Sequence, residues 1–184
     1  AIYYGDNHAI GNADEAMQQV ESAMFEAKRR GRDTVVLFDA QITRQARQRI
    51  NMQSSLRKAV ANQEFDLYVQ PQVSTHSGEV VGGEVLLRWI HSGEGRSPVD
   101  FIPILESSGM IVDVGLWVIR TACEYLRNKL DRGIWHDNMQ MAVNISPKQF
   151  HDPHLIKSLE HSLKSYDIRP DMLTLEVTEN LLID

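Results

Sequence analysis

The sequence is poor in features that define several large classes of protein. Its 184 residues include one cysteine, Cys123, so no disulfide can form within the chain. Cys123 lies in the amphipathic stretch WVIRTACEYL, where a buried residue is expected rather than a reactive thiol. The longest apolar runs are well short of the roughly 18 residues that a membrane span needs, and no charged-then-apolar leader opens the sequence. We therefore expect a water-soluble, cytoplasmic chain without membrane contact of its own, and leave open a membrane anchor upstream in its parent.

Positive charge and nucleotide-binding motifs are also scarce. The sequence has 19 Lys and Arg against 25 Asp and Glu, a formal net charge of -6, which argues against a protein that coats DNA or RNA by bulk charge. A small anionic ligand would need a local site. The glycine-rich pieces at 82–83 and 93–95 match neither a phosphate-binding loop nor a dinucleotide fingerprint, and no Ser/His/Asp or Cys/His arrangement can be read from the spacing.

What the chain does contain is a globular composition, with 42% hydrophobic and 24% charged residues. In residues 1–39, apolar positions at helical spacing predict a helix that ends near Gly31, and a β-branched and aromatic run predicts a strand over 34–38. One helix and one strand cannot enclose a core, so we expect this segment to be the tail of a larger domain. Residues 40–63 predict one or two connecting helices with a basic, solvated face.

After Glu64 the pattern alternates between strand and helix. We predict strands over 66–73, 80–90, 139–146 and 172–179, and helices over 100–108, 114–132 and 153–166. Such alternation implies an α/β fold with a parallel sheet, either an open doubly wound sheet or a barrel. A closed (β/α)8 barrel takes about 250 residues, so residues 64–184 could form at most about half of one.

Polar side chains interrupt these predicted strands, where a buried parallel sheet should be apolar. The period of two places Glu84 and Arg88 on one strand face, while Asn144 and Glu176 come late in the following strands. Chemistry in such folds gathers at the carboxyl ends of the strands, where we expect Glu84, Asn144 and Glu176 to meet. Two carboxylates and an amide oxygen suit Mg²⁺, Mn²⁺ or Ca²⁺ rather than Zn²⁺, and Arg88 could hold a phosphate beside the metal.

A purely structural interpretation fits the same residues. Glu84 and Arg88 could form a buried ion pair, and Asn144 could cap a helix that begins after Ser146. Periodicity alone does not decide between a metal site and this ion-pair arrangement.

Four ordered motifs give the chain a specific family resemblance. They are LYVQPQVSTHSGEVVGGEVLLRW, DFIPILESSGMIVDVGLWVI, VNISPKQF and LEVTEN. Together they resemble the EAL family of bacterial cyclic di-GMP phosphodiesterases, whose three-letter signature stands here as Glu84-Val85-Leu86, with valine in place of the usual alanine. The segment NADEAMQQVESAMFEAKRRGRDTVVLFD is similar to the closing helix and strand of a GGDEF, diguanylate cyclase-like, domain. The GGDEF signature loop would lie upstream, so no cyclase activity is assigned.

This resemblance implies a domain order and a fold. Residues 1–39 would be the tail of the GGDEF-like domain, 40–63 a helical linker and the start of the EAL domain, and 64–184 the N-terminal half of an EAL-type (β/α)8 barrel of the TIM kind. Members of the family often pair through their barrels, so a homodimer is one expectation.

The resemblance also implies roles for individual residues. Glu84, Asn144 and Glu176 would bind Mg²⁺ or Mn²⁺, and Glu179 would steady a loop near the metals. Arg88 would bind a phosphate, and Gln70 would contact the bound dinucleotide; these six residues are the candidate site.

The activity implied is two-metal hydrolysis of cyclic di-GMP to linear pGpG. The family's paired aspartates and its lysine belong to the second half of the barrel, so we expect residues 1–184 alone to be inactive. The alternative function is a regulatory module that binds cyclic di-GMP without cleaving it.

Overall fold

The computed structural model describes residues 13–31, 33–36, 40–91 and 94–177. These residues fall into two compact units, Ala1–Ser54 and Ser55–Asp184, and each unit is described by itself. No single described helix is long and apolar enough to cross a membrane. Only the helices Pro98–Ser108 and Ile111–Asp131, bent by 119°, pass that test as a pair among the described residues.

The first unit is helical. Helix α1 (Ala13–Arg29) confirms the helix predicted near the start, and Gly31 follows it at a φ of 96°, a left-handed conformation that suits glycine. Helix α2 (Ala40–Asn62) begins in this unit and continues into the second, and it confirms the predicted connection as one helix. Residues 34–36 form no strand, so the strand expected over 34–38 is wrong there, while 37 and 38 lie outside the described residues. A strand needs a partner for its backbone groups, and the described part of this unit offers none.

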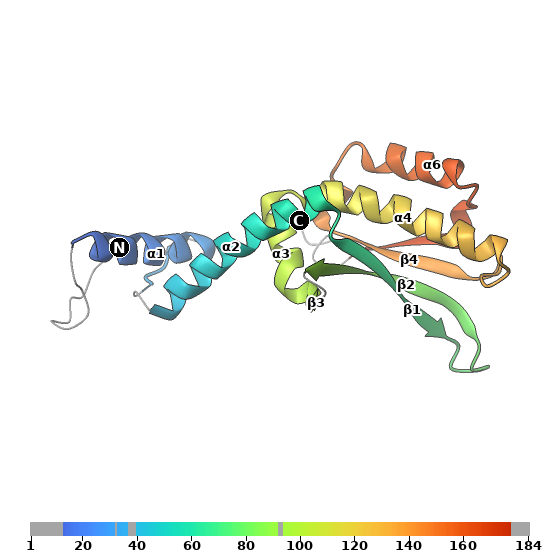
Figure 1. Ribbon diagram of the computed structural model, residues 1–184, viewed down its shortest axis with the longest axis horizontal. Coiled ribbons are helices and arrows are strands. Elements are labelled where there is room, and N and C mark those ends of the chain that lie inside the picture. The colour runs from blue at the N-terminus through green and yellow to red at the C-terminus, as the bar shows by residue number, and fades with distance from the viewer. Residues whose placement is uncertain (1–12, 32, 37–39, 92–93, 178–184) are drawn as a thin grey trace. The chain divides into compact units, whose positions relative to one another are not determined.

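A five-stranded sheet organises the second unit (Figure 1). Its strands are β1 (Phe65–Val73), β2 (Val80–His91), β3 (Glu94–Arg96), β4 (Gln140–Ile145) and β5 (Leu173–Val177). The order is β1-β2-β4-β5, with β3 paired to β2. Strands β2, β4 and β5 run parallel, whereas β1 and β3 run antiparallel to β2.

The antiparallel β1 corrects the prediction of a parallel sheet throughout. Only residues 74–79 join β1 to β2, and a parallel crossover needs a dozen or more residues. Ser74 N–H donates to the Glu79 carbonyl at 2.9 Å, and Gly78 takes a φ of 72° in this turn. The segment therefore closes as a hairpin.

Helices cover one side of this sheet (Figure 1). They are α3 (Pro98–Ser108), α4 (Ile111–Asp131), α5 (Pro147–Phe150) and α6 (Leu155–Ser165), with a short 3-10 helix η1 (Pro170–Met172) before β5. The helices and strands predicted between residues 66 and 177 are confirmed, while the short β3 and η1 were not expected. Helix α5 lies where the structural interpretation had a helix begin after Ser146.

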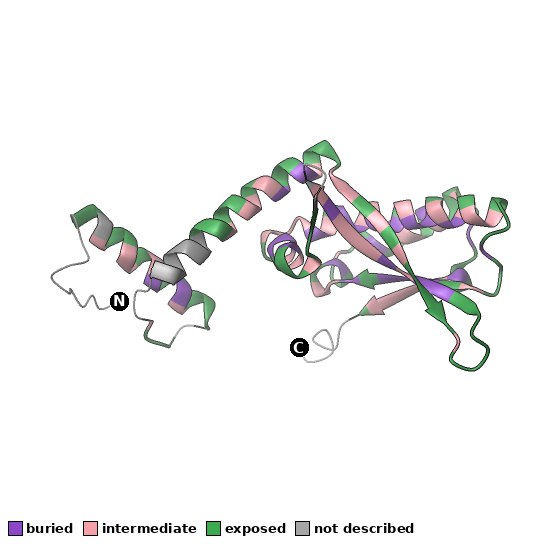
Figure 2. Ribbon diagram, turned by 60° about the horizontal axis from the view of Figure 1, so that its bottom comes forward, coloured by how far each residue is buried: buried purple, intermediate pink, exposed green. Residues whose placement is uncertain are grey.

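The core lies between α3, α4 and the helix-facing side of the sheet, and buried residues concentrate there (Figure 2). Trp89 packs edge-on against Phe101, with ring centroids 5.9 Å apart. Cys123 is fully buried in α4, which confirms its core position, and burial raises the pKa of its thiol to about 11.

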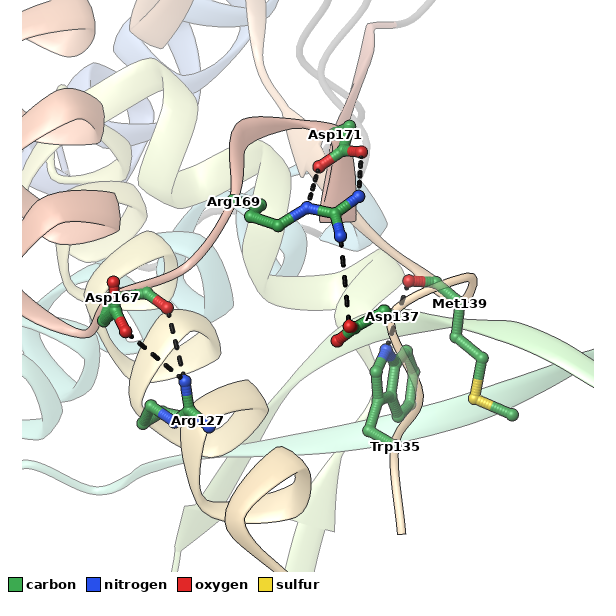
Figure 3. Close-up of polar contacts among 7 residues, drawn as sticks. All are labelled: Arg127, Trp135, Asp137, Met139, Asp167, Arg169 and Asp171. Carbon is green, nitrogen blue, oxygen red and sulfur yellow. Dashed lines mark hydrogen bonds and ion pairs between the residues drawn. The ribbon is translucent and has the colours of Figure 1, made fainter. Parts of the chain in front are cut away.

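The amino-terminal edge of the parallel strands carries ion pairs between the two crossover loops (Figure 3). Arg169 donates two hydrogen bonds to the Asp171 carboxylate and lies 3.9 Å from Asp137, which precedes β4. Arg169 thereby lowers the pKa of Asp171. Arg127 of α4 donates to the carbonyl of Asp167 at 3.3 Å. These contacts fasten the loops that precede β4 and β5, at the edge opposite the one where the candidate residues cluster.

Candidate functional site

The strand register brings five of the six predicted residues, Gln70, Glu84, Arg88, Asn144 and Glu176, onto one face of the sheet. Gln70 pairs with Glu84, Glu84 pairs with Ala142, and Asn144 pairs with Glu176. Residues paired in register share a face, and residues two apart on a strand share it too. The alternate residues, including Val85, Met141 and Val143, are buried on the helix-facing side.

Glu84 and Asn144 are in direct contact. The side-chain amide nitrogen of Asn144 donates to Oε1 of Glu84 at 2.6 Å, across 60 residues of sequence. Glu84 is half-buried and Asn144 is exposed, so a ligand can reach the pair from the open side of the sheet. Because the amide nitrogen faces Glu84, the amide oxygen is left to accept from, or coordinate, another group.

The sequence predicted Glu84 at the carboxyl end of its own strand, but the structure does not place it there. Strand β2 continues to His91, but its parallel ladder with β4 ends at the pair Val85 and Val143. Glu84 is therefore at the carboxyl end of the parallel part of the sheet, and the rest of β2 pairs with β1 and β3.

Arg88 shares the face of Glu84 but is not its partner. Four residues of strand separate the two by about 13 Å of backbone, and the structure records no ion pair between them among the described side chains. The Arg88 guanidinium instead lies over the Tyr68 ring, 5.6 Å from its centroid, and Nη1 donates to the Leu87 carbonyl at 3.0 Å. The buried ion-pair interpretation is therefore wrong.

Asn144 is not a helix cap either. Ser146 caps α5: its Oγ accepts from Gln149 N–H at 3.3 Å, and its own N–H donates to Gln149 Oε1 at 3.0 Å. With the cap supplied by Ser146, the Asn144 amide is available to Glu84.

Two of the remaining predicted residues, Gln70 and Glu176, are placed by strand register. Gln70 is exposed opposite Glu84, and Glu176 is half-buried beside Asn144 in register. Glu179 lies outside the described residues.

A mostly apolar cavity of about 250 Å³ adjoins Arg88 and Asn144, between β2, β4 and the helices α3 and α4. Two polar residues that the sequence reasoning missed, Glu106 and Gln149, also line it. Gln149 could have been found, because Ser146 followed three residues later by Gln149 is a capping-box pattern. Glu106 carries no such signal in its helix.

The donors suit a hard divalent cation, but they supply only part of its coordination. Glu84, Asn144 and Glu176 offer oxygen atoms alone, as Mg²⁺ and Mn²⁺ prefer. Within the described residues, no group of three or more His, Cys, Asp or Glu side chains is close enough to hold a metal ion. Further ligands would have to come from elsewhere.

Comparisons with known proteins identify the family of the chain. Residues 53–184 match the EAL domain family. The chain is 35% identical over 181 residues to the bifunctional diguanylate cyclase/cyclic di-GMP phosphodiesterase MucR of Pseudomonas aeruginosa, covering 98% of this chain and 26% of that protein. It is 32% identical over 171 residues to the cyclic di-GMP phosphodiesterase NbdA of the same species, covering 92% and 22%.

Among solved structures, the PaMucR phosphodiesterase in complex with c-di-GMP is 36% identical with a TM-score of 0.67, over 72% of this chain and 53% of that one. The chain thus spans about a quarter of these curated relatives and about half of the solved phosphodiesterase. The mixed α/β fold is shared with these neighbours, and the chain belongs to the EAL domain family.

Proposed function

We propose that this chain is the first half of an EAL barrel that hydrolyses cyclic di-GMP to linear pGpG. The observation that carries the proposal is the Glu84–Asn144 contact of 2.6 Å, with Glu176 in register beside it, inside a segment that matches the EAL family. The named activity of MucR and NbdA and the c-di-GMP complex of PaMucR support the choice of substrate.

We propose Mg²⁺ or Mn²⁺ as the cofactor, in keeping with the metal dependence of EAL phosphodiesterases. Glu84, Asn144 and Glu176 would hold it, because their oxygen atoms match the ligand preference of both ions. When bound, the cation would acidify a water molecule and offset charge on the phosphate.

The other residues of this face would bind and orient the substrate. The Tyr68 ring and the Leu87 carbonyl hold the Arg88 guanidinium in place. The N–H groups of Arg88 that do not contact Leu87 can bind a phosphate oxygen. Gln70, opposite Glu84, can hydrogen-bond to the dinucleotide. Glu179 belongs to the same proposal through the family resemblance. In the reaction, water adds to one phosphorus, one P–O ester bond breaks, and the ring opens.

We further propose that residues 1–39 are the closing segment of a GGDEF-like domain and that the chain pairs through its EAL part. The alignment with MucR, a protein described as a diguanylate cyclase as well as a phosphodiesterase, covers 98% of the chain and so includes this region. Light scattering after size-exclusion chromatography tests the pairing.

The experiment that tests the function follows pGpG formation from cyclic di-GMP by chromatography, with Mn²⁺ or Mg²⁺. It compares residues 1–184, a longer polypeptide that carries a whole EAL domain, and the longer form with Glu84→Ala. We expect turnover by the longer form alone, and its loss with Glu84→Ala. Binding of cyclic di-GMP by the longer form without any turnover would favour the regulatory module instead.

A further inference from the structure

On its β2 side, Asn144 lies just beyond the last backbone pair of the sheet. The ladder between β2 and β4 ends at Val85 and Val143, one residue before Asn144, while pairing with β5 continues through Ile145. The Asn144 side chain nevertheless reaches back to Glu84 on β2. Its orientation must therefore depend on how the chain is fixed immediately after β4.

That fixation comes from Gln149. Its side chain accepts from Ser146 N–H while its backbone N–H donates to Ser146 Oγ, so both ends of the turn after Asn144 are tied. Gln149 is 4% exposed, whereas its neighbours Lys148 and Phe150 are exposed. The residue is thus turned inward, against α4.

The inward position of Gln149 exists because residue 115 is glycine. A β-carbon built on Gly115 would overlap the amide group of Gln149. Gly115 is buried in α4, where glycine is otherwise unfavourable by about 1 kcal/mol relative to alanine. The glycine makes room on the helix surface for the amide that secures the turn.

We propose that Gln149, seated on Gly115, is a positioning residue for Asn144, and through it for the cation site. Gln149 does not touch the reacting atoms; it sets the turn that presents the Asn144 amide to Glu84. This inference rests on the proposed function for its catalytic meaning, but the positioning itself concerns a contact present without metal or substrate.

The test uses the 184-residue chain and the NMR resonances of the Asn144 side-chain amide, assigned by their loss in Asn144→Asp. The variants are Gln149→Ala, Gln149→Glu and Gly115→Ala. The control is Gly95→Ala, where an added methyl group meets nothing within 4 Å. Circular dichroism shows which variants fold.

We expect Gln149→Ala and Gly115→Ala to shift the Asn144 amide resonances and Gly95→Ala to leave them in place. Gln149→Glu should keep them close to the parent positions, because a carboxyl in either protonation state accepts from Ser146 N–H. In a longer polypeptide that carries a whole EAL domain, Mn²⁺ affinity should fall about tenfold with Gln149→Ala, the size of effect typical of groups that orient metal ligands.

Folded Gln149→Ala with unshifted Asn144 resonances would overturn the inference, and this variant decides the question if Gly115→Ala does not fold. Failure of the longer polypeptide to bind Mn²⁺ would count against the proposed cofactor, whereas the resonance positions in the 184-residue chain would still decide the role of Gln149. The two proposals therefore fail separately.

Discussion

At the scale of single residues, the Glu84–Asn144 contact joins strands that are far apart in sequence and supplies the polar centre of the site. The neutral amide of Asn144 donates a hydrogen bond to the carboxylate of Glu84, so the one negative charge of the pair lies beside a hydrogen-bond donor. The contact lies on a half-exposed face, which keeps its contribution to stability modest.

Asn144→Asp tests this pairing of charge with a neutral donor. The substitution places a second carboxylate against Glu84, and we expect it to lower the free energy of unfolding at neutral pH by about 1 kcal/mol. That corresponds to a fall in Tm of about 2–4 °C for a chain of this size. Differential scanning calorimetry measures it, with Asn144→Ala as the control that removes the donor without adding charge. Equal Tm values for the two variants would show that repulsion contributes nothing.

At the scale of elements, β2 and β4 approach closely at Gly82, where β2 carries no side chain. A β-carbon on Gly82 would overlap the backbone carbonyl of Gln140, its partner in register. Glycine in a strand interior often marks such close approach. The sequence shows the glycines but not which strand lies beside them, because the pairing depends on the connection through α3 and α4.

Gly82→Ala should force β2 away from β4 and lower the free energy of unfolding by about 1–3 kcal/mol, as overpacking does. Urea unfolding followed by circular dichroism measures the change. Gly95→Ala, which adds the same methyl group in open space, should change it by less than about 0.5 kcal/mol. A similar effect of both variants would mean that the contact with Gln140 is not the cause.

The end of α1 supplies a pH-dependent element. Glu26 accepts hydrogen bonds from Arg29 at 2.7 Å and Arg30 at 2.8 Å, and these bonds lower its pKa from 4.5 to about 2. A carboxyl whose pKa is lower in the folded state stabilises that state above pH 4.5 and loses this effect as the pH falls toward 2. Glu26→Gln should remove this part of the acid sensitivity.

The measurement is helicity by circular dichroism between pH 6 and pH 2 for the parent and Glu26→Gln. We expect the parent to lose more helix than the variant as Glu26 becomes protonated. Superimposable pH profiles for the two proteins would contradict the prediction.

At the scale of the whole molecule, the stabilising core belongs to the second unit. Among described residues, Ala23 is the buried hydrophobic residue of the first unit, whereas Leu56, Trp89, Phe101 and the interior of β4 all belong to the second. All three tryptophans, at 89, 117 and 135, also lie in the second unit, so their fluorescence reports on it alone.

We expect a polypeptide of residues 55–184 to unfold at the same urea midpoint as the whole chain. The free energies of unfolding of the two should agree within about 0.5 kcal/mol. Tryptophan fluorescence during urea unfolding compares the two. A clearly lower midpoint for residues 55–184 would show that the first unit stabilises the second.

Much of this molecule could be predicted from periodicity. The helices α3, α4 and α6 and the strands β2, β4 and β5 have strong apolar patterns, and the shared face of Glu84 and Arg88 follows from the period of two. The partner of Glu84 could not be predicted, because the strand register that places Asn144 beside it emerges only in three dimensions. The reversed β1 could have been inferred from the short connection at 74–79, which the alternating pattern obscured.

That reversed strand also fixes where the chain enters the sheet. Because β1 is antiparallel to β2, its first residue Phe65 lies beside Trp89, toward the carboxyl edge, and Glu64 just before it accepts from Ile90 N–H at 2.9 Å. In an all-parallel barrel the first strand would begin at the opposite edge. Here the end of α2 is attached at the rim that carries Arg88, so a rotation of this helix would reach that rim directly rather than through the length of a strand.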